Sequence, residues 1–575
     1  MRLKSILSTA LCTALMLSAS DADACTNVII SRGASKDGSC MVSYAADSHW
    51  LYGELYFHPA ADWKPGTLLD IREWDTQRPL GRIAQVPHTF QTVGNMNEHQ
   101  LIIGETTFGG RHDLVDTTGI MDYGSLIYIT LQRAVTAREA IETIVSLANE
   151  YGYASEGETF SITDGEEAWV MDLIGKGNGN KGIVWVARRI PDGYICAHAN
   201  QSRITRFPLN DPENCLYAPD VISFAREKGW FNGKDEEFSF RDAYNPLDFS
   251  GARACEARTW SAFNILGDGT FTYISEDGKE HSEPAEKWLD FAMGYNLDGE
   301  MPLFIKPSRK IGVKDVADVM RDHYEGTPMD MTQDIGAGGN ALPYRWRPMG
   351  FEHDGKKYIN ERAIATQQTG FWFVAQSRSY LPDQIGGLLW FGCDDAATSY
   401  LTPIYTSTAD VPESMRTGNG DLLHYSPTSA FWICNRVANA CYKMYDRMAP
   451  FVRAHADAFE NSQIETLVPA NDKAMLDVYT RLQKRHSRMD KKLRKMATDY
   501  TIETAQKQFQ AWSKLEETLL VKYIDGNVKA QDENGAFKHS QYSEGMPEGL
   551  TQPGYTEFWK AAVATSPHAK VLQEP

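Results

Sequence analysis

The first 25 residues constrain this 575-residue chain more than any other segment. A basic start with Arg2 and Lys4 leads into an apolar run of about 12 residues, 6–17, which is shorter than the roughly 20 residues that a membrane span needs. Ala22-Asp23-Ala24 then stands directly before Cys25, as small residues do at signal-peptidase sites. We therefore predict a signal peptide over residues 1–24, export to the periplasm or the exterior, and a mature chain that begins at Cys25.

A cysteine directly after a signal peptide also occurs at the attachment site of lipoproteins. That signal usually has Leu three positions before the cysteine, with small neutral residues between them. Here the three positions hold Ala22, Asp23 and Ala24, and the charge of Asp23 fits the lipoprotein pattern badly. A lipid-anchored binding protein without catalysis is therefore the weaker alternative.

Residues 25–47 have the pattern of a β-hairpin. The segments Thr26–Ser31 and Cys40–Ala46 are rich in strand-forming residues. Between them, Gly33–Ser39 contains Asp37-Gly38, which is a strong turn signal. The sequence thus predicts two paired strands directly after the predicted cleavage site.

The predicted hairpin brings a carboxylate to the start of the mature chain. Facing residues of an antiparallel pair have a constant index sum, so a turn centred near Lys36 places Cys25 opposite Asp47. A carboxylate there would hold or orient the new α-amino group. The structural alternative is that Asp47 caps the turn that follows.

A cysteine at a free N-terminus carries a nucleophile and a base on one residue. The thiolate is the attacking form, and an ordinary cysteine has a pKa near 8.5. The new α-amino group has a pKa of about 7.7–8.0, which suits it to accept the thiol proton. Cys25 is therefore the predicted nucleophile, and no histidine is needed as its base.

Acyl transfer also needs donors for the oxyanion that forms on the attacked carbonyl group. Asn200 follows a predicted strand and is the candidate donor. Asn95 and Asn97 lie in a predicted hairpin turn, where a structural role is favoured.

The rest of the chain reads as an α+β protein with a helical C-terminal part. Strand patterns lie on both sides of two helical patterns over 123–133 and 136–151, which favours a layered α+β fold. We predict a catalytic domain over 25–427, a helical hairpin over 428–540 packed on it, and an irregular tail over 541–575. Residues 481–495 carry eight Lys or Arg against one Asp, a pattern typical of a solvated helix face.

The net charge of −19 disfavours nucleic acid and anionic membranes as partners. Of nine cysteines, one lies in the predicted signal peptide and Cys25 is the nucleophile, which leaves seven for disulfides or for buried free thiols. The spacings match no zinc or calcium motif, so we expect no cofactor. The sequence leaves open whether the chain forms a homo-oligomer.

Several motifs, taken in order, resemble the dipeptidase family of cysteine N-terminal-nucleophile (Ntn) hydrolases. They are Cys25-Thr26, Asp37-Gly38, Asp47-Ser48, Asn97-Glu98, Gly104-Glu105-Thr106-Thr107, Pro191-Asp192-Gly193, Ala199-Asn200 and residues 321–327. The resemblance runs from residue 25 to about 410. It implies a four-layer αββα sandwich, a cysteine nucleophile freed by processing, and hydrolysis of dipeptides. The wider superfamily also contains penicillin V acylases and bile salt hydrolases, so an N-acyl amide hydrolase is the alternative enzyme.

The resemblance also implies site residues. In the acylases an Arg precedes the catalytic Asp by three residues, and that position is Tyr44 here. Either Arg253 or Arg258 matches a second superfamily arginine, and we assign Arg258 to the site. The candidate substrate-binding residues are Tyr44 and, from the family motif Gly104-Glu105-Thr106-Thr107, Glu105 and Thr107.

Overall fold

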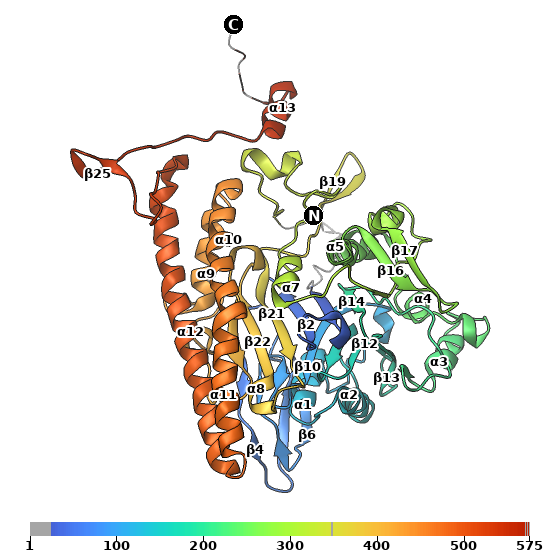
Figure 1. Cartoon of the computed structure of the whole chain (residues 1–575). Helices are drawn as coiled ribbons and strands as arrows, with labels where there is room; N and C mark the ends of the chain where they lie inside the picture. Colours follow the sequence, from blue (N-terminus) through green and yellow to red (C-terminus); the bar gives the residue numbers. More distant parts are fainter. Residues whose placement is uncertain (1–24, 347–348, 570, 572, 574–575) are drawn as a thin grey trace, which may run out of the picture.

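The computed structural model describes residues 25–346, 349–569, 571 and 573. The predicted signal peptide, residues 1–24, lies outside the described residues. Within the described part of the chain, helices and strands are both abundant and the last long helices follow the strands (Figure 1). The α+β class with a helical C-terminal region is confirmed.

Two antiparallel sheets form the centre of the described part of the chain. In the first, seven strands run in the order β18-β14-β1-β2-β21-β22-β23, with bounds Phe304–Ile305, Ile195–His198, Thr26–Ile30, Cys40–Asp47, Thr369–Ser377, Gly387–Cys393 and Thr402–Tyr405. In the second, eight strands run in the order β15-β13-β12-β11-β10-β9-β8-β3, with bounds Cys215–Tyr217, Ile183–Arg189, Ala168–Gly175, Gly157–Thr163, Ile102–Gly109, Met96–Asn97, Thr92–Val93 and Phe57–His58.

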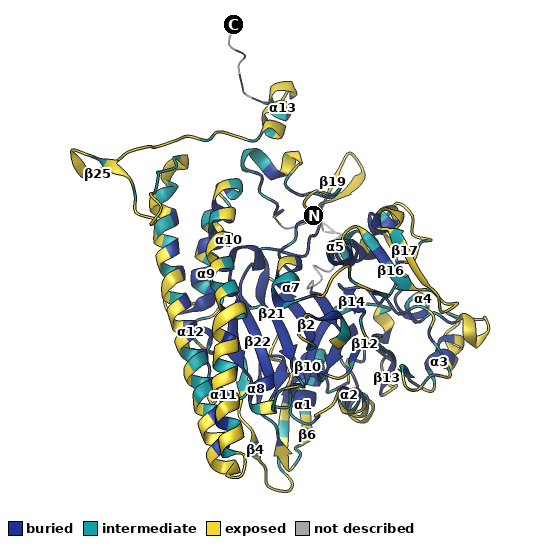
Figure 2. Ribbon diagram, in the orientation of Figure 1, coloured by how far each residue is buried: buried dark blue, intermediate teal, exposed yellow. Residues whose placement is uncertain are grey.

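The first sheet has two buried faces, as its dark blue strands in Figure 2 show. Successive side chains of a strand point to opposite faces. On β1, Asn27 and Ile29 therefore face the second sheet, where Asn27 contacts Ser161 of β11. Val28 and Ile30 face the opposite way and pack among helices.

Helices cover the outer faces of both sheets. The helices α1 (Tyr123–Leu131) and α2 (Ala137–Tyr151), predicted from their apolar spacing, lie on the second sheet. A reciprocal pair of hydrogen bonds between Thr136 and Glu139 fixes the start of α2. On the first sheet lie α5 (Ala257–Leu266) and α7 (Val313–Val319). The order of layers is thus helices, sheet, sheet, helices.

Four long helices follow the sheets: α9 (Ala430–Cys441), α10 (Tyr445–Ser462), α11 (Val468–Leu482) and α12 (His486–Lys522). Figure 1 shows α11 and α12 side by side along the edge of the first sheet. There α12 packs on β23, the edge strand. A buried ion pair between Arg378 and Asp472 of α11, 2.5 Å long, also joins the helices to the sheet.

The C-terminal segment is more regular than the sequence predicts. Residues 541–575 were expected to form an irregular tail, yet they contain strand β25 (Ser543–Pro547) and helix α13 (Glu557–Thr565). None of the described residues of α13 is buried. Its start is fixed by Thr556, whose side chain accepts a hydrogen bond from the backbone N–H of Trp559.

Among the described residues, none of the helices is both long and apolar enough to cross a membrane.

Candidate active site

Cys25 lies directly before β1, with its side chain 6% exposed at the wall of a cleft. Its Sγ atom is 3.5 Å from Oε1 of Glu105 on β10 and 3.6 Å from the hydroxyl oxygen of Tyr44 on β2. Burial, followed by the charges of Glu105 and Asp47, raises the pKa of the Cys25 thiol well above its ordinary value. The group therefore rests as a thiol and needs a base before it can attack.

The hairpin forms, but its register differs by one residue from the prediction. Thr26 pairs with Ala45, so Cys25 aligns with Ala46 and not with Asp47. The reason is the connection: a 3₁₀ turn over Arg32–Ala34 replaces a tight turn centred at Lys36. A bridge from Ser35 to Ile311, far along the chain, holds this turn.

Asp47 nevertheless lies beside Cys25, and both residues line the same small cavity. A bulge in the pairing of β2 with β21 falls between Ala46 and Asp47. The Asp47 carboxylate is fully buried and accepts hydrogen bonds of 2.6 Å from Arg362 and from Thr369. Burial raises the pKa of Asp47, whereas Arg362 and Thr369 act to lower it.

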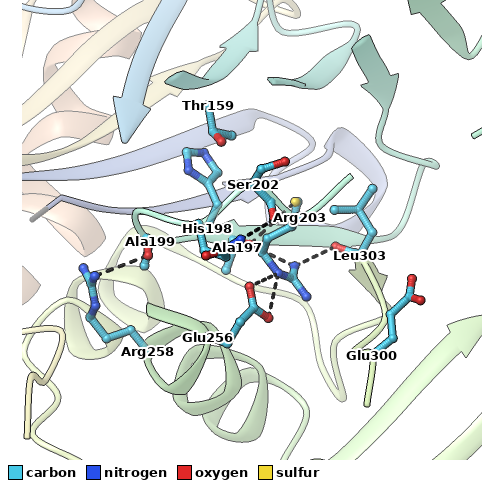
Figure 3. A network of polar contacts seen from close by, with 12 residues as sticks. Thr159, Ala197, His198, Ala199, Ser202, Arg203, Glu256, Arg258, Glu300 and Leu303 are labelled. Atoms are coloured by element: carbon cyan, nitrogen blue, oxygen red, sulfur yellow. Dashed lines mark hydrogen bonds and ion pairs between the residues drawn. The ribbon is translucent and has the colours of Figure 1, made fainter. Parts of the chain in front are cut away.

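Arg258, on α5, holds the backbone of Cys25. One of its nitrogens donates to the carbonyl oxygen of Cys25 at 2.6 Å and to the hydroxyl of Thr26 at 2.9 Å. The other donates to Oδ1 of Asn200 at 2.9 Å and to the carbonyl of Ala199, the contact drawn in Figure 3. Of the two candidate arginines, Arg258 thus reaches Cys25.

The other candidate, Arg253, faces a different part of the chain. It forms an ion pair with Glu361 and donates to the carbonyl of Met293. No contact between Arg253 and Cys25 is found in the described part of the chain.

Asn200 connects Arg258 to the cleft. Its φ of +57° is left-handed, a conformation that Asn tolerates better than most residues. Its side-chain nitrogen donates to the carbonyl of Thr107 at 2.7 Å. In this geometry the amide braces the cleft wall, and its predicted role as an oxyanion donor stays a prediction. Asn95 and Asn97, at the β8–β9 turn, donate to the backbone carbonyls of Ile103 and Leu131, respectively, which supports a structural role.

A buried polar network supports this region from behind (Figure 3). Arg203 forms a buried ion pair with Glu256 at 3.0 Å and donates to the carbonyl of Ala197. His198 bridges the sheets through hydrogen bonds to Thr106 and Ser161, each 2.7 Å long. Burial, with Arg203 nearby, lowers the pKa of His198 to about 3, so this imidazole stays neutral.

Tyr44 and Glu105 contact each other as well as Cys25. The Tyr44 hydroxyl donates to Oε1 of Glu105. Thr107 donates instead to Oε1 of Glu158, on the neighbouring strand β11, at 2.7 Å. Glu158 was not predicted as a site residue. The signal for it in the sequence is a charged residue inside a strand, GETFSIT, whose other side chains are apolar or carry hydroxyl groups.

The cleft has a volume of about 690 Å³, which is in the range of small-molecule sites. Cys25, Glu105, Thr107, Glu158 and Asn200 all line it. A smaller aromatic cavity adjoins Cys25 and is lined by Tyr44, Trp74, Tyr123, Tyr128 and Phe371. The arrangement offers one nucleophile, carboxyl groups and an apolar wall to a small amide.

Of the other described cysteines, Cys255 also lines this cleft. All eight described cysteines are free thiols, so no disulfide forms within the described ranges. The same residues contain no group of three or more His, Cys, Asp or Glu arranged to hold a metal ion.

Comparison with known proteins identifies the class of enzyme. The sequence profile of Peptidase family C69 matches residues 58–458. The chain therefore belongs to this family and is a peptidase, a hydrolase. The matched range begins after the hairpin that carries Cys25 and Asp47, so it does not cover the predicted nucleophile.

Curated relatives match most of the chain at low identity. A probable dipeptidase B of Lactococcus lactis is 24% identical over 440 residues, covering 73% of this chain and 82% of its own length. A probable dipeptidase of Latilactobacillus sakei is 23% identical, covering 79% and 88%. Dipeptidase A of Lactobacillus helveticus is 22% identical, covering 76% and 85%.

Proposed function

We propose that this protein is an exported cysteine dipeptidase whose nucleophile is Cys25, freed as the N-terminal residue. One observation carries the proposal: Cys25 lies at the start of β1 in the wall of a small-molecule cleft, with its carbonyl oxygen held by Arg258. The family match and the names of the relatives support peptide hydrolysis and, more narrowly, dipeptides.

The proposed architecture is the αββα sandwich of Ntn hydrolases. The observed order of helices, sheet, sheet and helices supports it. In this view residues 25–427 form the catalytic domain, 428–540 a helical extension and 541–575 a tail.

In the proposed reaction the α-amino group of Cys25 accepts the thiol proton as sulfur attacks the scissile carbonyl carbon. The C–N bond breaks, the leaving amine takes that proton, and a thioester remains on Cys25. Water then attacks the thioester, its proton passes to the α-amino group, and the thiol is restored when the acid leaves. Asp47, beside Cys25, orients the α-amino group, and Asn200 is the candidate oxyanion donor.

The first experiment measures the intact mass of the mature protein. A mass equal to residues 25–575 with a free thiol is expected. An added diacylglyceryl group would reject the hydrolase in favour of the lipid-anchored alternative, since an acylated amine cannot act as base. The burial of Cys25 in the cleft wall supports the free form.

The second experiment replaces the nucleophile. Cys25→Ala should lower kcat/KM for dipeptides by at least about 1,000-fold while the circular dichroism spectrum is unchanged. An Ala variant with normal activity would reject the mechanism. Wild-type enzyme is also assayed with penicillin V and conjugated bile salts, and activity on those amides alone would favour the N-acyl amide hydrolase.

A further inference from the structure

Two carboxyl groups are buried beside Cys25 without a cationic side chain. Glu105 and Glu158 are 1% and 0% exposed, lie on adjacent strands, and both line the cleft. Within the described ranges, neither forms an ion pair with Lys, Arg or His, and Oε2 of each receives no hydrogen bond from an amide, hydroxyl or guanidinium group. A buried carboxylate without a cation is costly, so this arrangement points to a positively charged ligand.

The pair carries a partial negative charge near neutral pH. Burial raises the pKa of Glu105 to about 7. Burial and the charge of Glu105 raise the pKa of Glu158 well above its ordinary value, and the hydrogen bond between the two groups lowers the pKa of Glu105, so Glu158 holds a proton more readily and is the donor in this contact. The charge thus lies on Glu105, the carboxyl group nearer to Cys25.

Covalent geometry restricts which cation can reach this charge. In an α-aminoacyl group, the amino nitrogen is about 2.5 Å from the carbonyl carbon. A reacting sulfur approaches that carbon to about 3–3.5 Å. Since Oε1 of Glu105 is 3.5 Å from Sγ of Cys25, a carbonyl carbon poised for attack has its own α-ammonium group within reach of the carboxylate.

We propose that Glu105, assisted by Glu158, is the subsite that binds the α-ammonium group of the substrate's N-terminal residue. This inference rests on the proposed function and deepens it. It makes the enzyme selective for peptides with a free amino terminus. N-acylated amides would leave the Glu105 charge buried and unpaired, so the subsite disfavours them.

The test compares two substrates that differ only in the amino group: alanyl-alanine and propionyl-alanine. Wild-type enzyme should prefer alanyl-alanine by roughly 10- to 100-fold in kcat/KM, the usual range for a charge-assisted hydrogen bond. Glu105→Gln should reduce this preference to about threefold or less, and mainly through a rise in KM for alanyl-alanine. Glu158→Gln, which keeps a neutral donor, should reduce it less.

The matched control is Glu142→Gln, the same substitution at an exposed position on α2. It should leave the preference and both kcat/KM values unchanged. Circular dichroism of each variant checks that it folds.

Two outcomes would overturn the proposal. If Glu105→Gln lowers kcat/KM equally for both substrates, Glu105 acts on Cys25, as base or as partner of its α-amino group, and not on the substrate. If the variant keeps the full preference for alanyl-alanine, the ammonium group binds elsewhere. Both results differ from failure of the proposed function, in which Cys25→Ala would remain active on alanyl-alanine.

Discussion

The contacts between the body and the C-terminal helices bury their charges in pairs, whereas the cleft buries Glu105 and Glu158 without a cation. At the helices, Arg321 and Glu460 of α10 are each 1% exposed and joined by two hydrogen bonds of 2.5 and 3.0 Å. Both regions are equally dry, so burial alone does not distinguish them. The difference is whether the protein supplies the counter-charge or leaves it to a ligand.

The largest expected effect on stability is at the C-terminal helices. Glu460→Ala leaves Arg321 buried without its partner, so we expect the free energy of unfolding to fall by about 3–5 kcal/mol. Urea denaturation followed by circular dichroism measures it. The control is Glu516→Ala, which removes a partly exposed ion pair with Arg436 and should cost less than about 1 kcal/mol. Equal losses in the two variants would contradict the distinction.

In the cleft, removal of a buried carboxyl group is expected to stabilise the protein rather than destabilise it. The pKa of Glu105 is raised from 4.5 to about 7 on folding, so its contribution to stability is full below pH 4.5 and is lost as pH rises through 7. Glu105→Gln removes this penalty. Relative to wild type, its free energy of unfolding should rise by roughly 2–3 kcal/mol at pH 8 and little at pH 4.5. Urea denaturation at both pH values tests this, and a variant less stable at pH 8 would refute it.

The smallest expected effect is a shift in the pH dependence of activity when the contact between Tyr44 and Glu105 is removed. The hydrogen bond from Tyr44 lowers the pKa of Glu105, so Tyr44→Phe should raise it. Since the protonated carboxyl group binds an ammonium group poorly, the acid limb of kcat/KM for alanyl-alanine should move to higher pH by roughly half to one unit. Tyr52→Phe, whose hydroxyl instead donates to the carbonyl of Asn419, is the control and should leave the limb in place.

Much of the site could be predicted because its signals are local. The cleavage pattern, the hairpin and one family motif are enough to select Cys25, Tyr44 and Glu105, which the structure brings into contact. Asp47 lies beside Cys25 as predicted, although the predicted pairing of the two hairpin strands was wrong by one residue. A hydrophobic pattern reports where strands lie, but it does not report that the connection of this hairpin is bridged to Ile311, far along the chain.

What could not be predicted depends on distant partners. Arg362 reaches Asp47 across 315 residues, and no spacing in the sequence announces that contact. Glu158 becomes significant only when β11 pairs with β10 and brings its carboxyl group to that of Glu105. The helical character of the C-terminal region was detectable from its long patterns, but a helical hairpin was predicted where the structure has the four helices α9 to α12, and α13 was not predicted.

Arg258 donates hydrogen bonds to the carbonyl oxygen of Cys25 and to the hydroxyl of Thr26. Thr26 is also held by main-chain pairing of β1 with β2. None of these contacts depends on which side chain residue 25 carries. The main-chain position of residue 25 is therefore fixed independently of its side chain, and a Cys25→Ser exchange would change only the side-chain contacts with Glu105 and Tyr44. The reactive side chain at residue 25 can therefore change by mutation while the fold that positions it stays the same.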